Sequence, residues 1–216
     1  TYPNMMTREG VRGMEYNAWS DGNPPEHTTI LPFTRMLAGP LDYTPGIFDL
    51  LLKKHENIRK KHAGKNFTRR VHTTLTKQLA LFVILYSPLQ MAADLVENYQ
   101  NHPAFQFIDD VPVDWETTKV LNGEIGDYIT IARKDRHSDD WYLGSITDEK
   151  ERQLEISLNF LEENKSYETH IYQDVRDAHW EKNPTAYEIE KRTVTSKDLI
   201  KLNLVPGGGT AIRFHP

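Results

Sequence analysis

The chain has 216 residues, of which 38% are hydrophobic and 10% aromatic, and it carries a formal net charge of −5. This content of apolar side chains supports packed cores, and the length suits two domains, or one domain and part of another. The acidic balance argues against nucleic acid and anionic membrane as the main partners. The absence of cysteine excludes disulfide scaffolds, thiolate metal sites and a cysteine nucleophile.

Targeting segments are not visible in the sequence. No stretch reaches the ~18 apolar residues of a membrane span, and no signal peptide is present. The chain begins Thr1-Tyr2-Pro3-Asn4, without an initiator methionine. We therefore expect it to be a fragment of a longer protein, so that missing targeting signals carry little weight.

The first half of the chain reads as loops followed by a helix. Pro, Gly and Asn are frequent over the first fifty residues, and a basic cluster follows at 53–62. That cluster is either a phosphate site or, more simply, a solvated face. Apolar side chains at helical spacing then predict a helix over 74–86, with Leu75, Leu79 and Phe82 on one face and Lys77 and Gln78 off it.

This helix resembles those in the outer layer of an α/β barrel. Ser87-Pro88 is expected to end it, and residues 89–99 offer another turn or two. In a partial barrel, the apolar face of the helix would lie exposed.

After Pro112 the spacing of the apolar side chains changes from about every fourth residue to every second residue. Alternation at 129–131, 154–160, 200–204 and 212–214 predicts antiparallel strands with one wet face. Asn122-Gly123 and Gly207-Gly208-Gly209 are turn signals. We therefore predict the C-terminal part of an α/β barrel over residues 1–110 and an antiparallel, sandwich-like β domain over 111–216, the latter burying its own core.

The segment 7–19 is the strongest candidate for chemistry. Glu9 and Glu15 lie six residues apart, among glycines and beside Tyr16 and Trp19. Glycosidases use paired carboxylates, and aromatic rings stack on the apolar faces of sugars. Carboxylates also supply the hard oxygen ligands that calcium prefers. The simpler alternative is a pair of exposed charges in a glycine-containing loop.

Other candidate residues allow functional and structural interpretations. His27, which follows Glu26, is either a metal ligand or a hydrogen-bonding residue in a turn. Asp42 either takes part in a site at the end of a barrel strand or is structural. Three tryptophans of the β region could form a sugar platform or pack in a core, namely Trp115, Trp141 and Trp180. The motifs G-x-S-x-G, G-x-x-x-x-G-K-[ST] and H-E-x-x-H are absent.

Six segments, in order along nearly the whole chain, carry a resemblance to glycoside hydrolase family 97. They are Arg8–Asn17, Pro32–Gly46, Tyr86–Asp94, Lys119–Tyr128, Asp139–Gly144 and Pro206–Gly209. The resemblance implies a calcium-dependent exo-acting α-glycosidase that removes terminal α-linked galactose or glucose from an oligosaccharide. It also implies a (β/α)₈ barrel, a C-terminal antiparallel β domain, and a periplasmic or secreted bacterial enzyme.

Residue roles follow from the same resemblance. Glu15 takes the place of the family's general acid, and Glu9 that of a calcium ligand, with Glu15 also near the ion. The catalytic base or nucleophile, and at least one more calcium-binding glutamate, would lie upstream of Thr1. Residues 1–216 alone are therefore expected to be inactive. The alternative is a non-catalytic carbohydrate-binding or structural fragment of such an enzyme.

Overall fold

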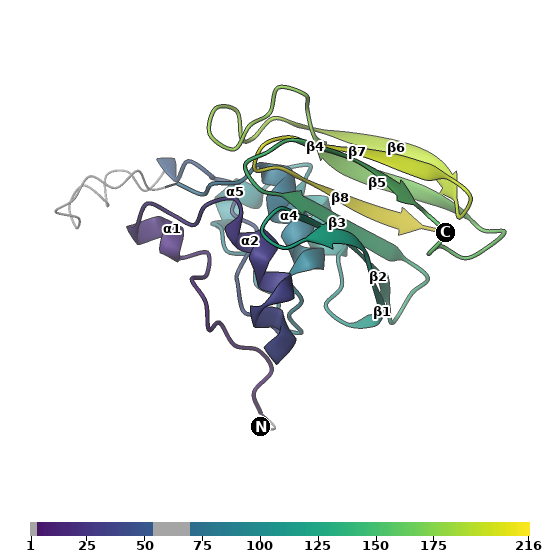
Figure 1. Ribbon diagram of the computed structural model, residues 1–216, viewed down its shortest axis with the longest axis horizontal. Coiled ribbons are helices and arrows are strands. Elements are labelled where there is room, and N and C mark those ends of the chain that lie inside the picture. Colours follow the sequence, from purple (N-terminus) through teal and green to yellow (C-terminus); the bar gives the residue numbers. More distant parts are fainter. Residues whose placement is uncertain (1–3, 54–69) are drawn as a thin grey trace.

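The computed structural model describes residues 4–53 and 70–216. In the described part, short helices come first and eight strands follow (Figure 1). The helices are α1 (Tyr16–Trp19), α2 (His27–Ile30), the 3₁₀ helices η1 (Leu31–Phe33) and η2 (Arg35–Ala38), α4 (Leu75–Ile84), α5 (Val96–Tyr99) and α6 (Phe105–Asp110). The strands are β1 (Trp115–Glu124), β2 (Tyr128–Asp135), β3 (Trp141–Thr147), β4 (Arg152–Ser157), β5 (Ser166–Asp174), β6 (Tyr187–Thr195), β7 (Leu199–Leu204) and β8 (Gly209–His215).

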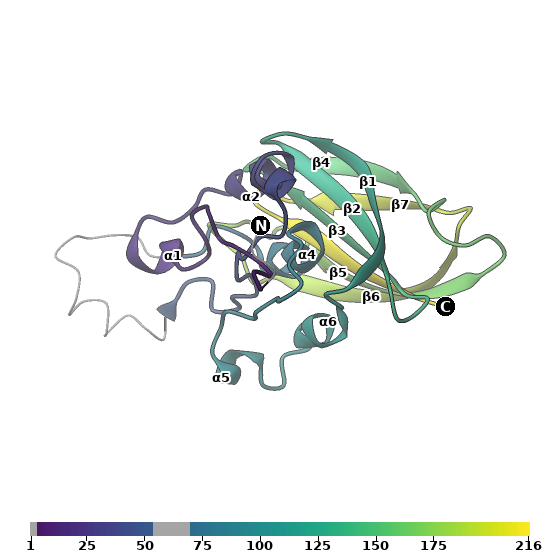
Figure 2. The ribbon, with the colours of Figure 1, turned by 90° about the horizontal axis from the view of Figure 1, so that it is seen from below.

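The strands form two antiparallel sheets. One has six strands in the order β1-β2-β3-β8-β5-β6, and the other pairs β4 with β7. The small sheet packs on one face of the large one, and α4 packs on the opposite face (Figures 1 and 2). The prediction of a mainly antiparallel β region is confirmed. Among the described residues before Trp115 there is no strand, only an isolated parallel bridge between Arg8 and Leu41.

Strand β3 shows why both faces of the large sheet are buried at its centre. Alternate side chains of a strand point to opposite faces. Trp141 and Leu143 belong to the core shared with β4 and β7, whereas Tyr142 and Ile146 belong to the core shared with α4. All seven residues of β3 are buried as a result.

Helix α4 lies very close to the sheet because two glycines face it. A Cβ on Gly144 of β3 would lie 2.7 Å from the carbonyl oxygen of Ala80, and one on Gly209 of β8 would lie 2.8 Å from the Cα of Lys77. Only glycine permits this approach of two backbones.

The expectation of an exposed helix face is wrong. Helix α4 begins after the N-cap Thr74 and ends at Ile84, and all ten of its residues are buried, Lys77 and Gln78 included. The sheet covers one side of the helix, while residues of the first part of the chain, among them Leu41 and Tyr43, complete the same core. An amphipathic pattern was the wrong interpretation because this helix has no solvent face.

The expectation that the region 111–216 buries a core of its own is confirmed for one of its two cores, and the other is shared with the rest of the chain. Apolar residues of the large sheet join α4 and the first part of the chain in one cluster, namely Trp115, Ile129, Ile131, Tyr142, Ile146, Tyr172 and Ala211. Only the second cluster, between the two sheets, lies wholly within the β region.

Several local predictions also need correction. Asn122-Gly123 is no turn but part of β1, where the register shifts between Val120 and Asn122, and the turn comes later at Gly126 with φ +84°. Strand β4 ends at Ser157, so the apolar run continues into a buried turn. Residues 89–99 yield only the short α5. The turn at Gly207, with φ +66°, is confirmed.

Ion pairs on Arg213 join the helical part to the sheet. The guanidinium of Arg213 in β8 contacts Asp110 of α6 at 2.7 Å and the buried Asp140 at 2.8 Å. Within the described ranges, no helix is long and apolar enough to cross a membrane.

Candidate active site

The carboxylates of Glu9 and Glu15 converge on Gly13. A Cβ on Gly13 would lie 2.7 Å from Glu9 Oε1 and 2.8 Å from Glu15 Oε2. The backbone N–H of Gly13 donates to Glu9 Oε1 at 3.0 Å. The six-residue spacing therefore brings both carboxylates to one point, with a glycine between them because no larger residue fits.

The pKa of Glu15 is raised. Burial is the largest cause, followed by a hydrogen bond with the Glu9 side chain and by the negative charges of Glu9 and Asp42. A carboxyl with a raised pKa stays protonated to higher pH, so it is better suited to donate its proton. A cation bound between the two carboxylates would lower the pKa of Glu15, because a nearby positive charge favours the ionised carboxylate.

A second loop fixes the backbone around Gly13. Asn23 Nδ2 donates to the carbonyl oxygens of Arg12 at 3.2 Å and Gly13 at 3.1 Å. The backbone N–H of Asn23 donates to Asn17 Oδ1 at 2.9 Å, on the other side of Glu15. The buried Asn23 thus holds the chain before Glu15 with its side chain and after Glu15 with its backbone N–H.

The site loop lies beside two other segments of the first part of the chain. Arg8 and Leu41 form a parallel bridge, and the backbone N–H of Leu41 donates to Tyr86 O at 2.9 Å. Met14 N donates to Tyr43 O at 3.1 Å. These bonds place the residues that follow Arg8, which include both glutamates, next to those that follow Leu41.

The remaining candidates differ in their contacts. His27 Nε2 lies 3.0 Å from Arg12 O, so it donates a hydrogen bond to a carbonyl, and burial lowers its pKa. Trp115 and Trp141 are buried, which confirms the packing interpretation, and Trp180 packs against His72 with ring centroids 4.9 Å apart. Glu26 is exposed. Asp42 contributes its backbone N–H, which donates to Arg8 O at 2.9 Å, and its charge near Glu15.

The basic cluster falls mostly outside the described residues. Lys53 is exposed, and the rest of the cluster belongs to 54–69. Nothing in the described part therefore bears on a phosphate site there.

Calcium takes six to eight oxygen ligands. Among residues 4–53 and 70–216, no group of three acidic or histidine side chains is gathered as a metal site would need. Glu9 and Glu15 offer the right chemistry, hard carboxylate oxygens at one point, but only part of a coordination sphere. Within the described residues, Glu9 and Glu15 are therefore suited to provide two of the ligands of a calcium ion.

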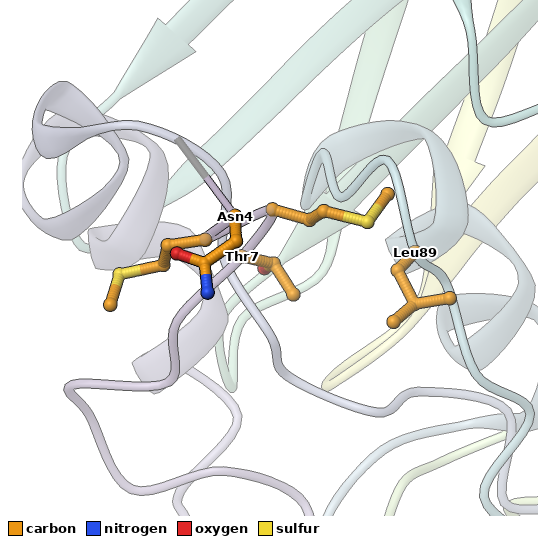
Figure 3. Close-up of a pocket in the computed structure, with 5 residues that line it drawn as sticks. Asn4, Thr7 and Leu89 are labelled. Carbon is orange, nitrogen blue, oxygen red and sulfur yellow. The ribbon is translucent and has the colours of Figure 1, made fainter. Parts of the chain in front are cut away.

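An open hollow of about 560 Å³ lies elsewhere, between the start of the described chain and the segment after α4 (Figure 3). Asn4 and Thr7 lie on one side of it and Leu89 lies across from them (Figure 3), and Met5 and Met6 complete the lining. Neither glutamate lines it. The exposed methionines and leucine make it an apolar surface rather than the chemical site.

Some residues that shape the site were missed by the sequence analysis. Gly13 counted only as part of a glycine-containing loop, and Asn23 was not considered. Lys77 was assigned to the solvent side of a helix, yet its Nζ donates to Pro25 O and to Thr147 O, each at 2.7 Å. The signal for Lys77 was the uninterrupted apolar run from Leu79 to Ile84, which is typical of a fully buried helix.

Comparison with known proteins defines the class. Residues 114–215 match the family described as "Glycosyl-hydrolase 97 C-terminal, oligomerisation". A glycoside hydrolase family 97 enzyme from Pseudoalteromonas sp. strain K8, solved in complex with acarbose, is 54% identical over the whole chain, with a TM-score of 0.90. A variant of that enzyme was solved with panose. The chain belongs to glycoside hydrolase family 97.

Curated relatives agree with this assignment. A retaining α-galactosidase of Bacteroides thetaiotaomicron is 34% identical over 99% of the chain, and a probable retaining α-galactosidase of Streptomyces bingchenggensis is 29% identical over 100% of it. The chain spans about a third of these relatives, 31% and 29% of their lengths, and 32% of the Pseudoalteromonas enzyme.

Proposed function

We propose that this chain is the acid-bearing part of an exo-acting α-glycosidase that hydrolyses terminal α-linked galactose or glucose. The observation that carries the proposal is the convergence of Glu9 and Glu15 on Gly13, in a chain of this family. The relatives support the substrate class: two are named as α-galactosidases, and a third binds acarbose and panose. Panose consists of α-linked glucose units, so the proposal includes both galactose and glucose as the terminal sugar.

In this proposal Glu15 protonates the departing glycosidic oxygen. The carboxyl is exposed enough to reach a substrate, yet its pKa is raised by partial burial and by the neighbouring Glu9. Protonation of the leaving oxygen is the role of the acid in either class of glycosidase. The second carboxylate of the reaction would come from outside this chain.

Calcium would be held in part by Glu9 and Glu15. When bound, the ion supplies positive charge that orders the loop and attracts substrate hydroxyls. Glu9 also accepts a hydrogen bond from the Gly13 backbone, so it fixes the loop from within. Its charge raises the pKa of Glu15, which helps this carboxyl to keep its proton.

We further propose that residues 1–110 are the last part of a (β/α)₈ barrel and residues 111–216 its C-terminal β domain. The parallel bridge between Arg8 and Leu41, and the bond from Leu41 to Tyr86, support neighbouring parallel strands. The apolar hollow at Met5, Met6 and Leu89 would then face the preceding part of the barrel. A periplasmic or secreted enzyme remains part of this proposal.

Hydrolysis by the full-length protein tests the function. We expect release of p-nitrophenol from the α-glucoside or the α-galactoside, but not from the corresponding β-glycosides. Exhaustive chelation should lower the rate, and added calcium should restore it. Residues 1–216 alone should give no turnover. No hydrolysis of either α-glycoside by the full-length protein would contradict the proposal and would favour a non-catalytic carbohydrate-binding role.

A further inference from the structure

We propose that Lys77 is a positioning residue for the general acid, through which the β domain holds the Glu9–Glu15 loop in its working geometry. The inference rests on the proposed function of Glu15. It concerns how the loop is held in place, and Lys77 itself takes no part in the reaction.

Lys77 has a buried amino group with two backbone partners. It is fully buried in the first turn of α4, and its Nζ donates to Pro25 O and Thr147 O at 2.7 Å. One carbonyl belongs to the loop beside the acid, and the other ends strand β3. The side chain therefore joins three parts of the molecule: the site, the helix and the large sheet.

Burial of a charged group is unfavourable unless it is hydrogen-bonded. A leucine or methionine at this position would fill the core without that cost. The lysine is therefore suited to fixing one conformation of the Pro25 loop rather than to packing alone. Breaking its bonds would leave the Pro25 and Thr147 carbonyls without this donor.

The Pro25 loop transmits this constraint to the acid. Pro24 and Pro25 have fixed φ angles, so the segment between Asn23 and His27 is stiff. Asn23 and His27 then hold the Arg12 carbonyl at 3.2 and 3.0 Å. Asn23 also holds Gly13, the residue on which both carboxylates converge.

A neighbouring residue provides a matched control. Thr76 is also fully buried in the first turn of α4, and its hydroxyl donates to Gly209 O at 2.8 Å. It thus ties the helix to the sheet but not to the site loop. Thr76→Val removes the buried hydrogen bonds of this hydroxyl, to Gly209 O and to the Thr74 hydroxyl at 3.2 Å, while it keeps the shape of the side chain.

The test measures kcat/KM of the full-length enzyme on two substrates with the same terminal sugar. One is an α-linked disaccharide, whose leaving group needs protonation, and the other is the p-nitrophenyl α-glycoside, which needs little. A displaced acid should lower the disaccharide rate far more, since small misplacements cost up to ~10²-fold. A merely structural role would lower both rates by the same factor.

We expect Lys77→Met to lower the ratio of the two kcat/KM values by about tenfold or more, and Thr76→Val to leave it within about twofold. Glu15→Gln serves as the benchmark. If Glu15→Gln changes the ratio but Lys77→Met lowers both rates equally or neither, the role of Lys77 is refuted while the proposed function stands. If Glu15→Gln itself leaves the ratio unchanged, the proposed function fails first.

Should Lys77→Met lack a cooperative unfolding transition, Asn23→Leu takes its place. It removes the amide bonds to Arg12 and Gly13 at similar volume, further along the same connection. The same fall in the ratio is expected, and equal losses on both substrates would overturn the inference.

Discussion

Gly144 of β3 lies directly against the Ala80 carbonyl of α4, so close that a Cβ on the glycine would be 2.7 Å from that oxygen and 3.0 Å from the Cβ of Val83. Helix and sheet therefore form one core. Gly144→Ala should push them apart and lower the free energy of unfolding by about 1–3 kcal/mol, the usual cost of overpacking.

Thermal unfolding of the full-length protein measures this effect. Gly126→Ala, at a turn where nothing lies within 4 Å, is the control for glycine replacement itself and should cost only backbone strain. An unfolding temperature that Gly144→Ala does not lower would show that α4 packs less closely on β3 than described.

The buried Asp174 predicts a pH dependence of stability. Burial raises its pKa to about 7, although Thr74 and the Gly209 N–H donate to it at 3.0 and 3.1 Å. An unfolded aspartate has a pKa of ~3.9, so between about pH 4 and 7 the folded state binds more protons. This group's contribution to stability is therefore lost as pH rises through that window.

Asp174→Asn removes this contribution. The unfolding temperature of the variant, relative to wild type, should therefore improve steadily from pH 4 to pH 6.5. A difference that stays constant over this range would show that Asp174 does not titrate as burial predicts.

Gly13 gives a test of the geometry between the carboxylates. Gly13→Ala would place a methyl group 2.7 Å from Glu9 Oε1 and 2.8 Å from Glu15 Oε2, so the two side chains must move. We expect kcat/KM to fall by up to ~10²-fold, with little change in the unfolding temperature. Gly39→Ala, where the glycine has open space and φ +113°, should do the reverse: a small loss of stability and unchanged turnover. Full activity of Gly13→Ala would contradict the convergence of the two glutamates.

The sequence was sufficient to pair Glu9 with Glu15, whose carboxylates converge, and to locate most of the β region. Glu9 and Glu15 were singled out by their spacing and the family resemblance, and alternation located β4 and β7, because half-buried strands show their period directly. It placed α4 correctly, over 74–86 against the observed Leu75–Ile84, but did not indicate that the helix is buried on all sides. Lys77 was misplaced for the same reason: a single lysine in an apolar run is normally exposed, and only tertiary contacts reveal its two carbonyl partners.

Turn signals were equally dependent on context. Asn122-Gly123 has the composition of a hairpin turn. In the structure it belongs to β1 and pairs with Thr130 and Ile129 of β2, beside a register shift. Strand pairing over the full length of β2 outweighs the local preference. The roles of Gly13 and Asn23 depend on contacts between loops ten residues apart, which periodicity does not report.

Calcium binding provides a prediction for Glu9. Glu9→Gln keeps an oxygen that can accept from Gly13 N but removes a negative charge, so the calcium affinity of the full-length enzyme should fall by about an order of magnitude or more. Isothermal titration with calcium measures this. Glu26→Gln removes an exposed carboxylate near the same loop and should leave the affinity unchanged. Equal affinity in wild type and Glu9→Gln would remove Glu9 from the calcium ligands.

The most direct test of the account is Glu15→Gln in the full-length enzyme, assayed on an α-linked disaccharide and on the matching p-nitrophenyl α-glycoside. General acid catalysis contributes about 10²–10⁴-fold. The disaccharide rate should therefore fall by that order, while the aryl glycoside, whose leaving group needs little protonation, loses much less. Equal losses on both substrates, or an undiminished disaccharide rate, would show that Glu15 is not the acid.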